Sequence, residues 1–260
     1  MIHIEPIPAF NDNYIWCIFD DDSGKAAVVD PGEAGPVEEA LLAQQLELEK
    51  ILITHHHFDH TGGIEALTRH RDIPVYGPKN HQIASITHRL DEQSSMSLFD
   101  LNFTILEVPG HTLDHIALYC EDTGTGQPVL FCGDTLFAGG CGRIFEGNPT
   151  MMLNSLQKLA ALPPTTEIYC AHEYTLGNLA FANAVEPNNT ALNTRISADK
   201  QRREDDIPTV PSLLATELAT NPFLRCTEDT VIDSVKAQGG SNGDSEVDIF
   251  TAVRRWKDNF

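Results

Sequence analysis

The sequence is poor in basic residues, and this shortage excludes several classes of partner. Of its 260 residues, 17 are lysine or arginine and 38 are aspartate or glutamate, which gives a net charge of −21 at pH 7. Nucleic acids and anionic membranes both attract proteins through a basic face, and the sequence shows none. We therefore expect no nucleic acid and no membrane as a partner.

Long apolar runs, targeting patterns and paired cysteine motifs are also missing. No segment approaches eighteen apolar residues, and residues 1–6 lack a basic region followed by an apolar core and a small-residue cleavage site. The six cysteines show no C-x-x-C spacing and lie mostly within apolar runs, which favours buried free thiols over disulfides. These absences predict a cytoplasmic protein, which we expect to be a monomer.

The most informative segment that is present is THHHFDHTGG, residues 54–63. It follows the apolar stretch 50–53 and places three imidazoles and one carboxylate in H-x-H-x-D-H spacing. Imidazole nitrogen and carboxylate oxygen suit zinc, iron or manganese. The segment offers more ligands than one tetrahedral ion with an open catalytic position would take from it. It therefore indicates two neighbouring metal ions.

Three further candidate ligands follow short apolar runs in the same manner. They are His111 after residues 103–109, Asp134 after residues 129–132 and His172 after residues 168–171. Strands that deliver ligands to one sheet edge bring them together at a low cost in chain entropy. Glycines at 110 and 133 permit tight turns before two of these ligands. The repetition predicts that the candidates converge on one site.

Periodicity divides the chain near residue 174. Before it, strand patterns mix with helical patterns; the strands are expected at 2–8, 14–19 and 26–30, and the helices at 36–45 and 151–161. After it, strand signals vanish, and helices are expected at 176–185, 190–203, 212–220 and 246–257. The pattern predicts an α/β domain followed by a smaller helical domain.

Residues 239–243, GGSNG, match the G-x-S-x-G nucleophile elbow of serine hydrolases. That elbow needs a buried strand before it and a partner histidine, usually later in the chain. Residues 231–238 are typical of a helix instead, and no histidine follows His172. A flexible loop is therefore the better interpretation of this segment.

Four short motifs together resemble the metallo-β-lactamase superfamily of hydrolases: T-H-x-H-x-D-H at 54–60, P-G-H-T at 109–112, G-D-T at 133–135 and A-H-E at 171–173. Longer segments are similar to the glyoxalase II, or hydroxyacylglutathione hydrolase, family: DTLFAGGCGR at 134–143, AHEYT at 171–175 and RRWKD at 254–258. The resemblance extends from the first strand to the last residue. It implies an αββα metallo-β-lactamase-like catalytic sandwich over residues 1–173 and a helical substrate-binding domain over residues 174–260.

The resemblance also implies a set of seven metal ligands. A first ion is held by His55, His57 and His111, a second by Asp59, His60 and His172, and Asp134 bridges both. Two divalent ions per chain are therefore expected, with zinc favoured and iron or manganese as alternatives. His56 lies between two ligands and is expected to face away from them, and His115 is expected at most to orient its neighbours.

The activity that the resemblance implies is hydrolysis of S-D-lactoylglutathione to glutathione and D-lactate by a metal-bridging hydroxide, the second step of methylglyoxal detoxification. Asp59 and Asp134 are the expected catalytic carboxylates, and Asp59 is expected to orient the hydroxide or accept its proton. The residues implied to bind the glutathione part of the substrate are Arg143, Tyr174, Arg254 and Lys257. Phe145 stands where some members have tyrosine, which removes one hydroxyl.

Three other functions stay open from the sequence. A persulfide dioxygenase with one iron shares this kind of fold, but the long helical C-terminus with Arg254 and Lys257 disfavours it. A lactonase or β-lactamase of the same superfamily would have no need of those two cations. A metal-storage or structural protein would need neither a bridging Asp134 nor a substrate-binding segment.

Overall fold

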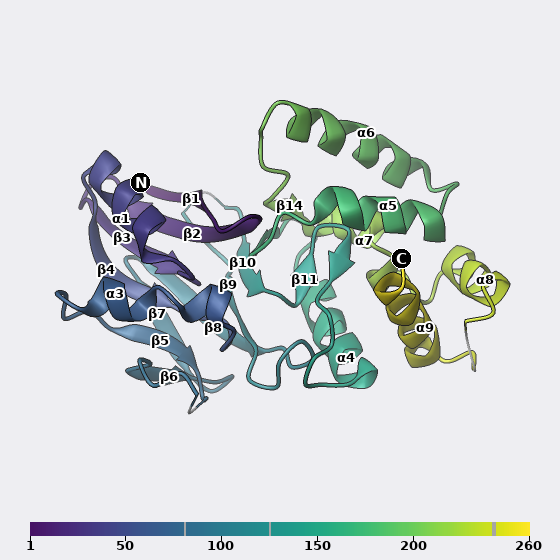
Figure 1. Ribbon diagram of the computed structural model, residues 1–260, viewed down its shortest axis with the longest axis horizontal. Coiled ribbons are helices and arrows are strands. Elements are labelled where there is room, and N and C mark those ends of the chain that lie inside the picture. The colour runs from purple at the N-terminus through teal and green to yellow at the C-terminus, as the bar shows by residue number, and fades with distance from the viewer. Residues whose placement is uncertain (81, 125, 241–242) are drawn as a thin grey trace. The chain divides into compact units, whose positions relative to one another are not determined.

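The computed structural model describes residues 1–80, 82–124, 126–240 and 243–260 (Figure 1). Ser241 and Asn242, the centre of the G-x-S-x-G match, lie outside the described residues. The chain divides into two compact units: residues 1–107 with 114–133, and residues 108–113 with 134–260. Each unit contains both strands and helices, although most of the helical residues belong to the second.

A six-stranded sheet with the strand order β1-β2-β3-β4-β5-β6 forms much of the first unit. Its strands are β1 (Ile2–Ala9), β2 (Asn13–Asp20), β3 (Lys25–Val29), β4 (Glu47–Leu52), β5 (Val75–Pro78) and β6 (His88–Leu90). The first three strands pair antiparallel, whereas β3 to β6 pair parallel. Parallel neighbours need a crossover connection. Helix α1 (Ala34–Gln44) crosses from β3 to β4, and α2 (Phe58–Thr61) with α3 (Ile64–Thr68) crosses from β4 to β5.

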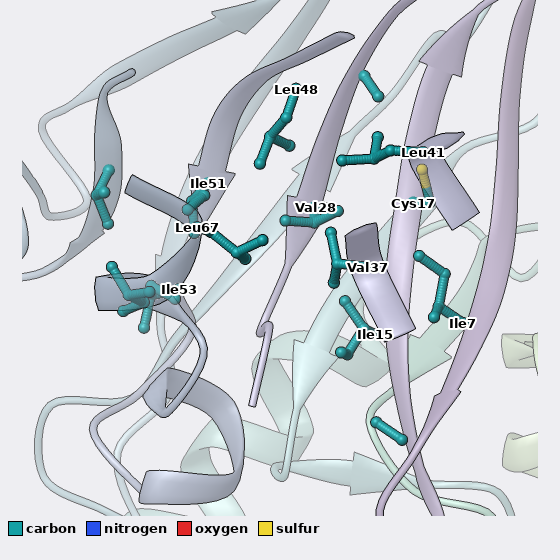
Figure 2. Close-up of a cluster of buried hydrophobic side chains, with 14 of the residues drawn as sticks. Ile7, Ile15, Cys17, Val28, Val37, Leu41, Leu48, Ile51, Ile53 and Leu67 are labelled. Carbon is teal, nitrogen blue, oxygen red and sulfur yellow. The ribbon is translucent and has the colours of Figure 1, made fainter. Parts of the chain in front are cut away.

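Buried side chains between this sheet and its helices form a hydrophobic core (Figure 2). In β2, the alternate residues Ile15, Cys17 and Phe19 belong to it, because successive side chains of a strand point to opposite faces of the sheet. Helix α1 contributes Val37 and Leu41, which are four residues apart and therefore lie on one helical face. The core holds β3 and β4 in place. Asp30 directly follows β3, and the H-x-H-x-D-H segment follows β4.

The first unit also contains an antiparallel run of strands in the order β7-β8-β9-β10. They are β7 (Ser95–Leu98), β8 (Leu101–Glu107), β9 (Ile116–Cys120) and β10 (Val129–Gly133). All residues of β9 and β10 are buried, which explains why their sequences read as continuous apolar runs. Strand β10 ends at Gly133, directly before Asp134.

The second unit is mainly helical, with two short strand pairs. Strand β11 (Leu136–Phe137) pairs with β12 (Gly140–Cys141), and β13 (Glu167–Cys170) pairs with β14 (Ser212–Leu213). The helices are α4 (Pro149–Ala160), α5 (Thr175–Val185), α6 (Thr190–Glu204), α7 (Leu214–Thr220), the 3₁₀ turn η1 (Pro222–Leu224), α8 (Asp229–Ala237) and α9 (Glu246–Asp258). A capping box between Ser245 and Asp248 begins α9.

The predicted mixture of α and β elements is confirmed, and the six helices predicted at 36–45, 151–161, 176–185, 190–203, 212–220 and 246–257 begin and end within two residues of their expected positions. The prediction that strands vanish after residue 174 is wrong. Residues 212 and 213 form β14, and Ile168 pairs with Ser212 in an antiparallel register. A segment of two residues is too short to show a period-two pattern in the sequence. Its extended conformation is determined by pairing with β13. Within the described ranges, no helix combines the length and the apolar character needed to cross a bilayer.

Candidate metal centre

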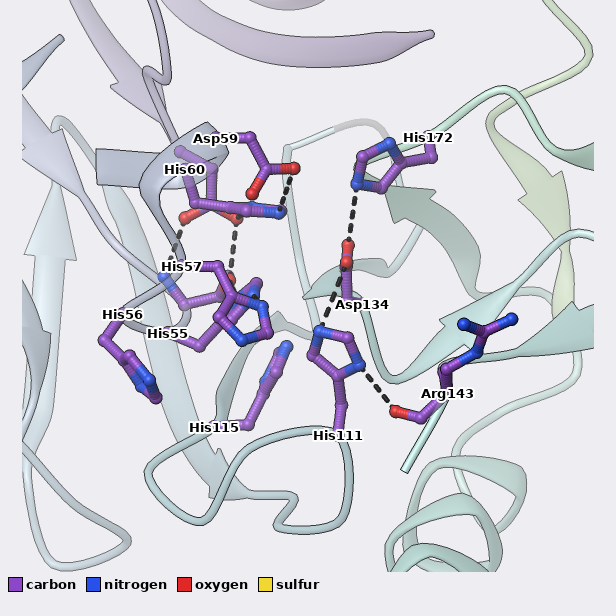
Figure 3. A network of polar contacts seen from close by, with 12 residues as sticks. His55, His56, His57, Asp59, His60, His111, His115, Asp134, Arg143 and His172 are labelled. Carbon is purple, nitrogen blue, oxygen red and sulfur yellow. Dashed lines mark hydrogen bonds and ion pairs between the residues drawn. The ribbon is translucent and has the colours of Figure 1, made fainter. Parts of the chain in front are cut away.

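The H-x-H-x-D-H segment follows β4 in the first unit, and its candidate ligands lie there as two pairs (Figure 3). His55 Nε2 lies 3.2 Å from His57 Nδ1, and His60 Nε2 lies 3.4 Å from Asp59 Oδ2. Two ligands bound at the usual zinc distances of about 2.0–2.1 Å in a tetrahedron lie about 3.3–3.4 Å apart. Each pair thus has the spacing of adjacent ligands on one ion.

The second unit brings two candidate histidine ligands together around the carboxylate of a third candidate ligand, Asp134. His111 Nε2 lies 3.4 Å from Asp134 Oδ2, and His172 Nε2 lies 3.3 Å from Asp134 Oδ1 (Figure 3). All three side chains are buried. Each carboxylate oxygen of Asp134 therefore faces a different imidazole, and the three side chains together offer atoms of the kind that bind metal ions. The donor atoms and spacings in both units fit divalent ions.

A buried carboxylate in the first unit orients two of the histidines. Asp30, which directly follows β3, accepts hydrogen bonds from His60 Nδ1 at 3.0 Å and from Thr54 Oγ1 at 2.7 Å. Since the Thr54 hydroxyl donates to Asp30, it can accept the Nδ1 proton of His55 across 3.0 Å. Both histidines therefore carry their proton on Nδ1 and present Nε2 as the ligand atom, the usual arrangement behind a metal-bound imidazole.

His111 in the second unit is oriented in the same way by the backbone. Its Nδ1 donates to the carbonyl oxygen of Arg143 at 2.7 Å, which leaves Nε2 facing Asp134. A side chain at Gly142 would obstruct this arrangement, because a Cβ there would lie 1.9 Å from the Asp134 carbonyl oxygen and 3.2 Å from His111 Nδ1. The glycine is therefore required by the close approach of three chain segments.

Aromatic rings pack against two of the candidate ligands, His172 and His55. Tyr174 stacks on His172 with 4.7 Å between ring centroids and an angle of 4° between the planes. His115 stacks on His55 at 4.5 Å and 16°, while its own Nδ1 donates to the carbonyl of Ile116. The contact with His55 agrees with the expected orienting role of His115. Tyr174, expected only to contact substrate, also supports a candidate ligand.

His56 faces away from the ligand pairs, as expected (Figure 3). Its Nδ1 lies 2.9 Å from Asp114 Oδ1, and the other oxygen of Asp114 accepts a hydrogen bond from Asn80. Asp59 receives a hydrogen bond of 3.1 Å from Asn13 Nδ2. Sequence reasoning missed Asn13, Asp30 and Thr54. For Asp30 a signal existed, since it ends an apolar run in the same way as the candidate ligands.

The predicted substrate-binding cations form a cluster in the second unit, here called the cationic cluster: Arg143, Arg254 and Lys257. Arg254 is only 7% exposed; its Nη1 donates to the Cys141 carbonyl at 3.1 Å, and its guanidinium covers the ring of Phe223. Lys257 Nζ donates to the Gly177 carbonyl at 3.3 Å. Burial, together with the neighbouring charge of Arg254, lowers the pKa of Lys257.

The cysteines behave as the sequence predicts. All six are free and buried. Cys141, adjacent to Arg254, has its pKa raised to about 11 by burial, so the thiol stays protonated at neutral pH. A protonated, buried thiol is a poor nucleophile, and packing accounts for Cys141.

Family models match nearly the whole chain. Residues 11–172 match the metallo-β-lactamase superfamily, and residues 173–260 match the hydroxyacylglutathione hydrolase C-terminus. Curated proteins named hydroxyacylglutathione hydrolase are similar over all of this chain: 49% identity for Nitrosomonas europaea (97% of that protein), 49% for Pseudomonas aeruginosa (100%) and 51% for Cupriavidus metallidurans (100%).

Solved structures share the fold. ETHE1 from Myxococcus xanthus superposes with a TM-score of 0.64 at 22% identity, over 99% of this chain and 98% of that one. A B3 metallo-β-lactamase gives 0.63 at 23%, over 86% and 99%. A protein crystallised in a di-iron-bound form gives 0.54 at 28%, over 65% and 91%. The chain therefore has a metallo-β-lactamase fold, extended by a C-terminal domain that matches the hydroxyacylglutathione hydrolases.

Proposed function

Because the chain belongs to the hydroxyacylglutathione hydrolase family of the metallo-β-lactamase superfamily, we propose that it hydrolyses S-D-lactoylglutathione to glutathione and D-lactate. This reaction is the second step of the glyoxalase route of methylglyoxal detoxification. The observation that carries the proposal is the placement of Asp134, whose two oxygens each face a different imidazole. Identity of about half the residues over the full chain supports the choice of a glutathione thioester as the substrate.

Two divalent metal ions per chain belong to this proposal, with zinc favoured and iron or manganese as alternatives. The proposed ligands are His55, His57 and His111 for one ion, Asp59, His60 and His172 for the other, and Asp134 for both. The ligand-like spacings within each unit and the di-iron form of a fold relative support two ions. When bound, such ions lower the pKa of a shared water towards neutrality and polarise the substrate carbonyl.

The protein's own groups orient the attacking water, accept its proton and fix the tautomers of the candidate ligand histidines. Asp59, held by Asn13, orients the attacking water and accepts its proton. Asp30 and the Arg143 carbonyl fix the tautomers of the histidines. A strong general acid is unnecessary, because a thiolate with a pKa of about 8.5 leaves without one.

Substrate recognition is assigned to the second unit. Glutathione carries two carboxylates, and a chain with a net charge of −21 needs a local group of cations to bind them. We assign this role to the cationic cluster, with the Tyr174 hydroxyl as a further donor. Residues 1–173 would form the catalytic domain and residues 174–260 the substrate-binding domain, a division supported by the change of family model at residue 173. We expect the protein to act as a monomer in the cytoplasm.

The test is turnover of S-D-lactoylglutathione by protein of known metal content. Asp134→Ala should lower both metal content and turnover, whereas His56→Ala should spare both, because His56 directs its Nδ1 at Asp114 and meets His57 only through a ring contact. Equal loss of metal in the two variants would contradict the ligand assignment. Oxygen consumption with glutathione persulfide and no thioester hydrolysis would indicate a dioxygenase. A fully metallated protein without turnover of any thioester, lactone or β-lactam would indicate metal storage.

A further inference from the structure

A carboxylate of the protein itself lies among the cations proposed to bind the substrate. Asp258, at the C-terminal end of α9, accepts hydrogen bonds from Arg254 Nε at 3.1 Å and Nη2 at 2.9 Å, both on Oδ1. The same oxygen lies 3.8 Å from Arg143 Nε. Asp258 thus contacts two of the three cations that were expected from the sequence to bind a carboxylate of glutathione.

The contacts of Arg254 leave little of its guanidinium for an incoming ligand. Its Nε and Nη2 face Asp258, its Nη1 faces the Cys141 carbonyl, and the side chain is buried. The edge formed by Nε and Nη2 is the one that a carboxylate normally uses for a two-pronged contact. Asp258 therefore occupies this edge of Arg254 in the free protein.

We propose that Asp258 is a positioning residue that stands in for the substrate carboxylate on Arg254 and thereby weakens the binding of anionic glutathione thioesters. The inference rests on the proposed function, because it takes the cationic cluster as the glutathione site. Asp258 fixes the guanidinium, but its charge opposes that of the arriving carboxylate. Glutathione released as a product carries the same carboxylates, so the same repulsion weakens product binding.

A purely structural role for Asp258 predicts the opposite result. If the carboxylate only anchored Arg254, its removal would loosen the guanidinium and raise KM. If it opposes the substrate, replacement by the isosteric amide keeps an acceptor for Arg254 and removes the repulsion, so KM falls. The sign of the change in KM therefore distinguishes the two roles.

The experiment compares Asp258→Asn with the wild-type protein, both loaded with metal. A carboxylate at roughly 6 Å in a partly hydrated site repels another by an energy that corresponds to about a three- to tenfold change in affinity. We expect KM for S-D-lactoylglutathione and the inhibition constant of glutathione to fall by about this factor, with kcat not increased. A small neutral thioester should keep its KM, and Asp258→Glu should restore the wild-type values.

A matched control is available in the same unit. Asp199 forms an i,i+4 pair with Arg195 at 3.2 Å on α6, as Asp258 does with Arg254 on α9. Asp199→Asn should leave KM for the glutathione thioester unchanged, because Arg195 is outside the cationic cluster. An equal fall in KM in both variants would show a general effect of net charge and would overturn the assignment to Asp258.

The remaining outcomes are also decisive. If the wild-type protein hydrolyses the thioester but KM in Asp258→Asn is unchanged or raised, the role of Asp258 is wrong while the proposed function stands. If the wild-type protein shows no thioester hydrolysis, the proposed function itself fails. Should Asp258→Asn not fold, Asp258→Ser is measured in its place, and failure of both variants to fold would make Asp258 a structural residue and overturn the inference.

Discussion

At the scale of single residues, the candidate metal centre contains side chains that orient the candidate ligands through hydrogen bonds, in addition to the ligands themselves. Asp30 accepts hydrogen bonds from His60 and from both the backbone and the hydroxyl of Thr54. Loss of such an orienting partner typically costs 10- to 100-fold in metal affinity. Asp30→Asn exchanges an acceptor oxygen for a donor amide, and we expect metal affinity to fall by about this factor in a chelator competition assay.

The control for this variant is another histidine–carboxylate pair in the same unit. Asp21 lies 2.6 Å from His3 Nε2 at the exposed edge of β1, and neither belongs to the ligand motif. Asp21→Asn should leave metal affinity unchanged. Equal losses in the two variants would mean that overall negative charge, and not orientation of His60, determines metal binding.

Lys257, a residue of the proposed glutathione site, predicts how substrate binding depends on pH. Its ammonium is charged below its pKa, and burial lowers that pKa from the ordinary value of about 10.4. The groups that face it are Arg254 and Asp258 of α9 and Cys141 of β12. As the pH rises through the lowered pKa, Lys257 loses its charge, so KM for the glutathione thioester should rise at a lower pH than an ordinary lysine would allow.

Steady-state kinetics across the alkaline range measures this rise. Lys257→Arg should abolish it, because a guanidinium stays charged at every accessible pH. A small neutral thioester, which has no carboxylate to bind, should show no matching rise in KM. A rise that persists in Lys257→Arg would have to come from another group.

At this scale the sequence predicted the candidate ligands but not their supports. Each candidate ligand lies within a recognisable motif or at the end of an apolar run, and these are local properties of the sequence. Asp30 and His60 are 30 residues apart, and their contact exists only once β3 and β4 are adjacent. The second role of Tyr174, stacking on His172, likewise depends on the turn between β13 and α5. Such contacts follow from tertiary structure, which periodicity does not contain.

At the scale of elements, α9 matters most for the proposed substrate site because it carries Arg254, Lys257 and Asp258. The Ser245 side chain accepts from the Asp248 backbone, and the Asp248 side chain accepts from the Ser245 backbone. Removing such a cap costs about 0.5–2 kcal/mol. We expect Ser245→Ala to lower the free energy of unfolding by this amount in a denaturant titration, and to leave KM nearly unchanged while the protein is folded.

Ser197 provides the comparison for this prediction. It is an exposed residue within α6, and its hydroxyl donates only to the backbone of the preceding turn, at Asn193. An interior helical serine gains little from this bond, so Ser197→Ala should be neutral or slightly stabilising. A loss of stability as large as that of Ser245→Ala would show that the cap has no special role.

The elements themselves were predicted well where they are long. Helix α4 shows its apolar spacing, and both α4 and α6 begin at asparagine caps, Asn148 and Asn189, so their positions follow from local sequence. Strand β14 was missed because two residues carry no periodic signal. The pairing partner, β13, lies more than forty residues earlier in the chain and is what makes residues 212 and 213 a strand.

At the scale of the whole molecule, we expect net charge and metal binding to affect stability together. The net charge of −21 disfavours the compact state through self-repulsion, and each unit contains a candidate-ligand carboxylate, Asp59 in the first and Asp134 in the second. General physical chemistry indicated a metal protein from the ligand spacing alone. The choice of a glutathione thioester came from resemblance, because the same fold serves lactamases and other enzymes, and fold does not determine substrate.

Removal of metal should therefore destabilise the entire protein. Ions that bind only the folded chain stabilise it by RT ln(1 + [L]/Kd), which is about 4 kcal/mol when the free ion exceeds Kd a thousandfold. Without them, the carboxylate of Asp134 and its imidazole neighbours lose the charge that offsets their desolvation. We expect chelator-treated protein to unfold several degrees lower in calorimetry, and re-addition of zinc to restore the midpoint with about two ions bound per chain. A stoichiometry that stays at one, with stability fully restored, would contradict the proposed two-ion centre and leave Asp134 as a ligand of a single ion.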